Sequence, residues 1–427
     1  MARLNVQNYG AAGDGSTDDT AAIQSAIDDA TAGDTVLFPA TDEYYAVSGG
    51  ESILQIGSTD NLTLEGEGPD TEVRYVGGNG GRNLYVFRID GGPTGFELRN
   101  MTINGGAENV AGDPNATLCI LVINGDPGNQ SYLFEDLLVE NSYGEGFTFR
   151  THDVTVRRCT ARENGKHGMN FGPHDSGGEP LRIEQCLIKD NSVIHPGHYG
   201  IDHATGSFVV EDTVIEGNHQ GCKTAGGSVD GVHRRTRIKN NGGHSYQSTN
   251  GKSGTLTFED VVFGPNNGAN VRLSGINYHV PDGAEVVVTG NTDTSGRAAM
   301  QVQAGGSLDA SGGTVWSNNN DYAGLGSITN TPGNVVGVYN HADNTGGPLG
   351  NTDNLSVDTR QEDTKTDIEG VPTADEVGAW SDSDTSDDSV TSIKTESGSL
   401  QSTSGTGSGS LRTVSRELQS RLNGDSD

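Results

Sequence analysis

An asparagine recurs in the turns of this chain at nearly constant spacing, and this repeat restricts the fold more than any other feature. Its members are Asn164, Asn191, Asn218 and Asn241, which are 27, 27 and 23 residues apart, and Asn141 lies 23 residues earlier. A short predicted β-strand precedes each asparagine, and a glycine followed by a second predicted strand comes after it. A unit of this length cannot bury an inner face alone, so neighbouring units must stack. The repeat therefore predicts a right-handed parallel β-helix whose stacked asparagines form a hydrogen-bonded ladder.

Alternation within the strands that follow these turns assigns side chains to the inside or the outside of the coil. The predicted inward residues are Phe147, Phe149, Met169, Phe171, Ile201, Cys222 and His203. The predicted outward residues are Thr148, Asn170, Asp202, Lys223, Ser245 and Asn270. Because neighbouring coils stack in register, the outward residues form one column in which Asp202 lies beside Lys223.

Two of the four cysteines occupy the same place in neighbouring coils. Cys159 and Cys186 each lie five residues before a repeat asparagine. Stacked coils lie about 4.8 Å apart, a separation that a disulfide can span. The alternative, which we favour, is a ladder of small buried thiols. The cysteine spacings match no zinc motif.

The chain divides into four segments by composition and pattern. Residues 1–40 form an entry segment with a predicted capping helix over 18–31, and residues 41–335 form the β-helix. An acidic tail or linker rich in Ser, Thr, Gly and Asp covers 336–410. Residues 411–427 form a short amphipathic helix that is marginal alone. The residues that share the apolar face of the capping helix are Ala22, Ile23, Ala26, Ile27 and Ala30.

The charge of the chain limits its partners and its setting. Its 58 acidic and 26 basic residues give a formal net charge of −32. This charge repels nucleic acid and anionic membranes, and molar salt screens its self-repulsion, so we expect a halophilic and archaeal setting. No apolar stretch of about 18 residues occurs, so no membrane insertion is expected. The expected location is extracellular or on a virion surface, without a recognisable signal peptide.

The opening segment carries a resemblance to a known superfamily. Residues 5–27, which read NVQNYGAAGDGSTDDTAAIQSAI, resemble the entry segment of pectate-lyase-like proteins. That superfamily includes polygalacturonases, pectate and alginate-type lyases, mannuronan C5-epimerases and phage tailspikes. The resemblance implies a helix that caps the first coil and a groove along the outside of the β-helix that binds polysaccharide.

A second stretch is similar to the catalytic modules of mannuronan C5-epimerases. Residues 168–175 read GMNFGPHD, where the family has the pattern YGFDPHE. The similarity implies that His174 corresponds to the catalytic histidine of the family. The tyrosine and the aspartate of the pattern fall on Met169 and Gly172, so two catalytic positions differ from the family.

Nine of the 11 histidines lie between residues 152 and 244. Removing the proton beside a uronate carboxylate requires a base, and a cation that neutralises the carboxylate. For this lyase chemistry, His174 or Lys223 is the predicted base. Arg150 is predicted to hold the carboxylate, and Tyr199 to donate a proton to the leaving oxygen.

Hydrolysis requires a pair of carboxylates instead, for which Asp175 and Asp202 are the candidates. The predicted substrate-binding residues are His152, His167, Asn170, Asp175 and His198. No cofactor is required by this chemistry, although Ca²⁺ can bridge a groove and an acidic substrate.

Other interpretations of these residues are open. His195 and His198 can order their loop or ligate a metal, although no third ligand is evident. His203 can be an inward residue satisfied by hydrogen bonds. The Asp202–Lys223 pair can be an ordinary surface ion pair.

Two functions follow from these features. The first is an enzyme that cleaves or modifies an acidic polysaccharide as a lyase, an epimerase or a hydrolase. The second is a non-catalytic tailspike of a halophilic virus that binds host glycan. Such a spike is expected to form a homotrimer or to dock to virion tail proteins.

Overall fold

The computed structural model describes residues 1–288 with gaps, followed by seven isolated strand segments. The gaps are Glu51, 78–83, 111–116, 124–130, His152, 173–178, 204–205, 225–227, 249–252, 265–270 and 274–275. The later segments are Met300–Val302, Ser307–Asp309, Thr314–Ser317, Tyr322–Gly324, Val335–Val336, Ile393–Lys394 and Leu400–Gln401. Apart from these segments, the predicted tail over 336–410 and the predicted helix over 411–427 lie outside the described residues.

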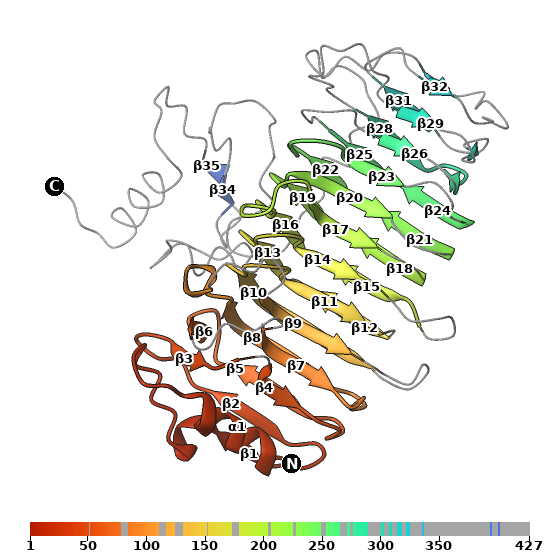
Figure 1. Cartoon of the computed structure of the whole chain (residues 1–427). Coiled ribbons are helices and arrows are strands. Elements are labelled where there is room, and N and C mark those ends of the chain that lie inside the picture. Colours follow the sequence, from red (N-terminus) through yellow and green to blue (C-terminus); the bar gives the residue numbers. More distant parts are fainter. Residues whose placement is uncertain are drawn as a thin grey trace.

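Parallel strands stack along the described chain in two long sheets, and Figure 1 shows the elongated column that they form. The smaller sheet has 11 strands: β4 (Ser52–Ile56), β7 (Leu84–Asp90), β9 (Thr117–Ile123), β11 (Phe147–Arg150), β14 (Met169–Phe171), β17 (Tyr199–His203), β20 (Gln220–Thr224), β23 (Tyr246–Ser248), β26 (Val271–Leu273), β29 (Met300–Val302) and β32 (Tyr322–Gly324). The larger sheet has 22 strands: β1 (Arg3–Asn5), β2 (Thr35–Phe38), β3 (Tyr45–Ser48), β5 (Thr63–Gly66), β6 (Glu72–Gly77), β8 (Glu97–Asn104), β10 (Tyr132–Glu140), β12 (Val154–Arg157), β13 (Thr160–Arg162), β15 (Leu181–Glu184), β16 (Leu187–Lys189), β18 (Gly206–Glu211), β19 (Val214–Glu216), β21 (Ser228–Arg234), β22 (Arg237–Lys239), β24 (Ser253–Glu259), β25 (Val261–Phe263), β27 (Asn277–His279), β28 (Glu285–Val288), β30 (Ser307–Asp309), β31 (Thr314–Ser317) and β33 (Val335–Val336). A separate antiparallel pair joins β34 (Ile393–Lys394) to β35 (Leu400–Gln401).

The larger sheet bends and supplies two faces of each coil. β10 shows the bend, because its first half pairs with β12 and its second half pairs with β13. Asp136 at the bend has φ 53°, and Arg158 in the next coil has φ 50°. The guanidinium of Arg158 donates to both carboxylate oxygens of Asp136, at 2.9 and 2.8 Å. The predicted parallel β-helix is therefore confirmed, with three strand faces per coil.

One helix lies at the N-terminal end of the stack (Figure 1). α1 (Thr20–Asp29) packs beside the 3₁₀ helix η1 (Val6–Tyr9) and strand β4. Its residues Ile23, Ala26 and Ile27 are buried in the same core as the first coils. No helix in the described part of the chain is long and apolar enough to cross a bilayer.

The asparagine ladder is present, but its first rung differs from the prediction. Asn164, Asn191 and Asn218 each donate their side-chain amide to the side-chain oxygen of the next ladder asparagine, at 2.9, 2.9 and 3.2 Å. The residue stacked on Asn164 is Ser142, whose backbone N–H donates to Asn164 Oδ1 at 3.1 Å. Asn141 occupies the preceding left-handed position with φ 54°. The prediction for Asn141 was thus wrong by one residue.

The four cysteines are buried and free. The thiol ladder is therefore correct, and Cys159 and Cys186 form no disulfide. Sγ of Cys159 and Cys186 contacts backbone oxygens at 3.3 to 3.5 Å. These two thiols act as small side chains at the bends between β12 and β13 and between β15 and β16.

Candidate functional site

The outer surface of the smaller sheet carries a column of polar residues, one from each of several successive coils. Asn170 pairs with Asp202, Asp202 with Lys223, and Lys223 with Gln247. Their neighbours in each strand, such as Met169, are fully buried, which confirms the predicted alternation. The column continues at Gln247, so the assignment of Ser245 was wrong, and Asn270 lies outside the described residues. Thr148 shares the column but is only 2 % exposed.

Asp202 and Lys223 form the centre of this column. The Lys223 Nζ lies 3.6 Å from Asp202 Oδ2, and the two side chains are 24 % and 15 % exposed. Burial raises the pKa of Asp202, and the Lys223 ammonium opposes that rise. Asp202 Oδ1 is buried and has no hydrogen-bond partner among the described residues. A half-buried carboxylate with one unused oxygen differs from an ordinary surface ion pair.

Tyr199 lies beneath the lysine at the start of β17. Its ring centroid is 5.2 Å from Lys223 Nζ, which is a cation–π distance. Its hydroxyl donates to Gln247 Oε1 at 2.8 Å, two coils away. This hydrogen bond fixes the ring under the lysine. It gives no support to the predicted role of Tyr199 as a proton donor.

His167 and His198 meet beside Asp202. His198 Nδ1 is 3.0 Å from His167 Nε2, and the same His167 Nε2 is 3.6 Å from Asp202 Oδ2. His167 is 5 % exposed, and burial and the neighbouring His198 lower its pKa to about 3. Burial and the cation of Lys166 lower the pKa of His198 as well. Both rings are therefore neutral at pH 7.

Arg150 lies at the other side of the column. Its Nη1 donates to the backbone oxygen of Phe149 at 3.3 Å and to Asn170 Oδ1 at 3.4 Å. A Cβ at Gly172 would lie 2.9 Å from Nη1, so the guanidinium fills the space beside the glycine. The epimerase pattern has an aspartate at this position, and this chain places a cation there. Met169, at the tyrosine position of the pattern, is buried in the core.

Three predicted residues, His152, His174 and Asp175, lie outside the described residues. The structure therefore brings together Arg150, Asn170, His167, His198, Tyr199, Asp202 and Lys223 from the predicted set. Gln247, which sequence reasoning missed, joins them.

The residues around Asp202 do not fit a metal ion. Ca²⁺ binds six to eight oxygen ligands, but the groups nearest the carboxylate are an ammonium and an imidazole. Within the described residues, no three His, Cys, Asp or Glu side chains come close enough to hold a metal. His195, the other histidine considered as a metal ligand, packs its ring edge-on against Tyr143, with centroids 5.1 Å apart.

Two other histidines lie in the core and not on the outer surface. His203 is 1 % exposed and stacks on Phe208, and His233 is fully buried beside Phe208 and Tyr246. The ring nitrogens of both have no hydrogen-bond partner among the described residues. His203 faces inward as predicted, but the expected hydrogen bonds are absent from this part of the chain because aromatic rings surround it.

We expect the variant His233→Phe to reduce the acid sensitivity of the fold. Burial lowers the pKa of His233 to about 3, so below about pH 6.5 the unfolded chain binds a proton that the folded chain cannot bind. Stability is then lost as the pH falls, by up to about 1.4 kcal/mol per pH unit. Between pH 8 and 5 the wild type should lose about 2 kcal/mol more than the variant in urea unfolding. Equal losses would contradict this account, and exposed His219→Gln is the control.

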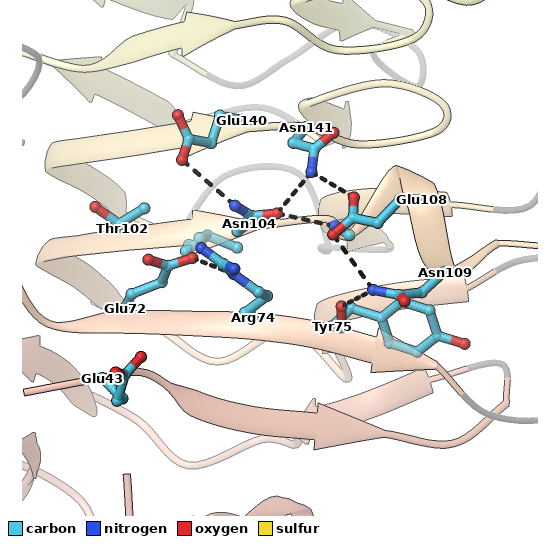
Figure 2. Close-up of polar contacts among 12 residues, drawn as sticks. Glu43, Glu72, Arg74, Tyr75, Thr102, Asn104, Glu108, Asn109, Glu140 and Asn141 are labelled. Atoms are coloured by element: carbon cyan, nitrogen blue, oxygen red, sulfur yellow. Dashed lines mark hydrogen bonds and ion pairs between the residues drawn. The ribbon is translucent and has the colours of Figure 1, made fainter. Parts of the chain in front are cut away.

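A second polar cluster lies on the larger sheet, beside the 3₁₀ helix η2 (Ala107–Asn109), and Figure 2 shows its contacts. Asn141 Nδ2 donates to Glu108 Oε2 at 2.8 Å and to Asn104 Oδ1 at 3.1 Å. Asn109 Nδ2 donates to the backbone oxygen of Tyr75 at 3.1 Å. These hydrogen bonds tie η2 to neighbouring coils, so the cluster has a structural role.

Comparison with known proteins identifies a family model that matches the chain and a solved structure with the same fold. The model of a family described as rhamnogalacturonase A/epimerase, pectate lyase-like, matches residues 3–246, which is more than half of the chain. The A-module of mannuronan C-5 epimerase AlgE4 from Azotobacter vinelandii superimposes with a TM-score of 0.59 at 20 % identity. That match covers 80 % of this chain and 100 % of the module, and it shows the shared fold.

Two curated proteins from one organism are similar to the chain in sequence. Mannuronan C5-epimerase AlgE2 of Azotobacter vinelandii is 30 % identical over 240 residues, covering 54 % of this chain and 23 % of that protein. Alginate lyase 7 of the same organism is 32 % identical over 175 residues, covering 39 % and 20 %. The chain thus spans less than a quarter of the length of these two curated relatives.

Proposed function

Because the chain belongs to the rhamnogalacturonase A/epimerase family of pectate lyase-like proteins, we propose that it modifies an acidic polysaccharide by removing the C5 proton of a uronate residue. One observation carries the proposal. A lysine cation and a pair of neutral histidines flank a half-buried carboxylate on the outer column of the smaller sheet. The relatives that are an alginate lyase and mannuronan C5-epimerases support the substrate class.

The first chemical step needs a cation where negative charge develops. When the C5–H bond breaks, its electrons spread into the uronate carboxylate. In this proposal Lys223 neutralises that carboxylate, and Arg150 is a second cation beside the column. Tyr199 holds the lysine from below through its ring. Asp202 orients the ammonium from the side, so the lysine is positioned before substrate arrives.

The same step needs a base in its neutral form. Among the described residues His198 meets this need, because its pKa is lowered and its ring is partly exposed. His174 remains the base implied by the epimerase resemblance. After proton removal, a lyase breaks the C4–O bond and forms a C4=C5 double bond. An epimerase returns a proton to the opposite face of C5.

Incubation with alginate, pectate and neutral glucan tests the proposal. A lyase product absorbs in the ultraviolet because of its C4=C5 double bond, and an epimerase product shows altered C5 configuration by proton NMR. We expect one of these changes with a uronate polymer, with EDTA present, and none with glucan. No change in either uronate polymer, or equal action on glucan, would contradict the proposal. Variants His198→Gln and His174→Gln then identify the base, because only the base variant should lose about 10²-fold or more in rate.

We also propose that the protein works outside the cell, in high salt. The formal charge of −32 makes the folded chain repel itself, and salt shortens the range of this repulsion from about 10 Å at 0.1 M to about 3 Å at 1 M. The melting temperature should therefore rise markedly between about 0.1 and 2 M KCl. A melting temperature that is unchanged or falls over this range would contradict the proposal. Mass measurement in the same salt tests the homotrimer expected of a virion spike.

A further inference from the structure

The contact between His167 and His198 has a third member, the backbone of Tyr199. His167 Nδ1 lies 3.1 Å from the backbone nitrogen of Tyr199 and 3.3 Å from its backbone oxygen. Both contacts have hydrogen-bond geometry, the first with Nδ1 as acceptor and the second with Nδ1 as donor. The other ring nitrogen, Nε2, faces His198 Nδ1 at 3.0 Å. The surroundings of His167 therefore accept either of its neutral tautomers.

Each tautomer of His167 fixes the same tautomer in His198, with both rings protonated on Nε2 or both on Nδ1. When His167 Nδ1 accepts from the Tyr199 N–H, its Nε2–H donates to His198 Nδ1, and His198 carries its proton on Nε2. When His167 Nδ1–H donates to the Tyr199 oxygen, its Nε2 accepts from His198 Nδ1–H, and His198 Nε2 has a free lone pair. His198 thus presents an acid in the first arrangement and a base in the second.

We propose that His198 exchanges the substrate proton through Nε2 and that His167 is a positioning residue whose tautomer sets whether His198 acts as base or acid. This rests on the proposed function. The C5–H bond breaks, its electrons stay on the sugar, and its proton binds His198 Nε2. His198 is then an imidazolium whose Nδ1–H donates to His167 Nε2, while His167 stays neutral. In a lyase, release of the Nε2 proton to the leaving oxygen restores the pair. In an epimerase, His198 releases this proton to water, and a second donor protonates the opposite face of C5.

Several charges surround the pair and limit its titration. Lys166, Lys223, His195 and His219 all disfavour a positive charge on His198. Asp202 Oδ2 lies 3.6 Å from His167 Nε2, the same nitrogen that faces His198, and favours the Nε2–H tautomer at rest. Protonation of His198 must overcome this preference, because an imidazolium at His198 needs His167 Nε2 as an acceptor. The tautomer of His167 should consequently follow the charge of His198.

Nitrogen NMR of histidine-labelled full-length protein tests this coupling directly, without substrate. At high pH, His167 should show a protonated Nε2 and a bare Nδ1. As the pH falls and His198 becomes charged, the two nitrogen shifts of His167 should exchange, while the ring remains neutral. Spectra of His167→Gln and His198→Gln assign the signals, and His279→Gln, on β27 of the larger sheet, is the control. A His167 that keeps its proton on Nε2 throughout, or that becomes charged, would overturn the proposal.

Kinetics separate a tautomer role from simple packing. In His167→Leu, no side chain at position 167 accepts a hydrogen bond from the imidazolium of His198, so the charged form of His198 is less stable. The acid limb of the pH–rate profile should therefore shift to lower pH by about one unit. The rate should also fall about 10²-fold. In His167→Gln, an amide oxygen can accept, so most of the loss should be recovered. Equal profiles for the two variants would contradict the proposal. A protein without activity on uronate polymers would reject the proposed function alone. The NMR titration would still show whether the tautomer of His167 follows the charge of His198.

Discussion

Replacing Lys223 with methionine is expected to lower the rate of uronate modification by about 10³-fold, with a smaller effect on substrate affinity. Methionine keeps the length and the apolar stem of the side chain but removes its charge. The carbanion that forms at C5 then loses the ammonium that Tyr199 and Asp202 hold in place. Because this charge develops mainly in the transition state, the loss should appear in kcat.

Lys189→Met is the matched control, since Lys189 lies on β16 in the larger sheet, away from the column. Its rate should stay within about twofold of the wild type, since it lies outside the proposed site. A Lys223→Met enzyme that retains a third of the wild-type rate would show that another group neutralises the carboxylate. Arg150→Met would then be the next variant to measure, because Arg150 is the second cation beside Asn170.

Replacing Asn191 with alanine is expected to destabilise the β-helix by about 4 kcal/mol. Asn191 Oδ1 accepts from the backbone N–H and the side-chain amide of Asn164, at 3.2 and 2.9 Å. Its own amide donates to backbone oxygens of Ala161 and Lys189 and to Asn218 Oδ1, all at 2.9 Å. Alanine removes all of these side-chain hydrogen bonds, and each buried group left unpaired costs about 1–3 kcal/mol.

Urea unfolding measures this effect, and exposed Asn8→Ala is the control. The control should change the unfolding free energy by less than about 0.5 kcal/mol. If Asn191→Ala were as stable as the control, the ladder would be a consequence of stacking and not a cause of stability.

The repeat in the sequence was sufficient to predict the fold, but not the register of every coil. Asparagine occurs on the ladder because of its side-chain hydrogen bonds, and it also occurs at the residue before the ladder, as at Asn141, because it tolerates the left-handed conformation. The turn after the ladder also varies in length. The first paired inward residue comes four positions after Asn218, at Cys222, but five after Asn241, at Tyr246. Ser245 therefore falls two residues before the column position Gln247, in the turn before β23, where it is buried and its hydroxyl donates to the backbone oxygen of Ile238.

The site was predictable where it depends on alternation within one strand. Asp202 and Lys223 follow from pairing adjacent coils, whereas the meeting of His167 and His198 depends on the loop before β17. That loop brings His198 back over the preceding coil, and no periodicity describes it. The surroundings of His203 were also hidden, because Phe208 reaches it from the larger sheet. Contacts between side chains of the two sheets depend on the path of the turns that connect the strands. The alternation of residues within one strand does not determine that path.

Deuterium incorporation tests the central claim most directly, since lyases and epimerases share C5 proton removal. The purified chain is incubated with a uronate polymer in D₂O, and the polymer is then hydrolysed and analysed by mass spectrometry and NMR. We predict either deuterium at C5 of epimerised residues or unsaturated ends that have lost the C5 hydrogen, both strongly reduced in Lys223→Met. A polymer that keeps every C5 hydrogen after prolonged incubation with wild-type protein would contradict the account.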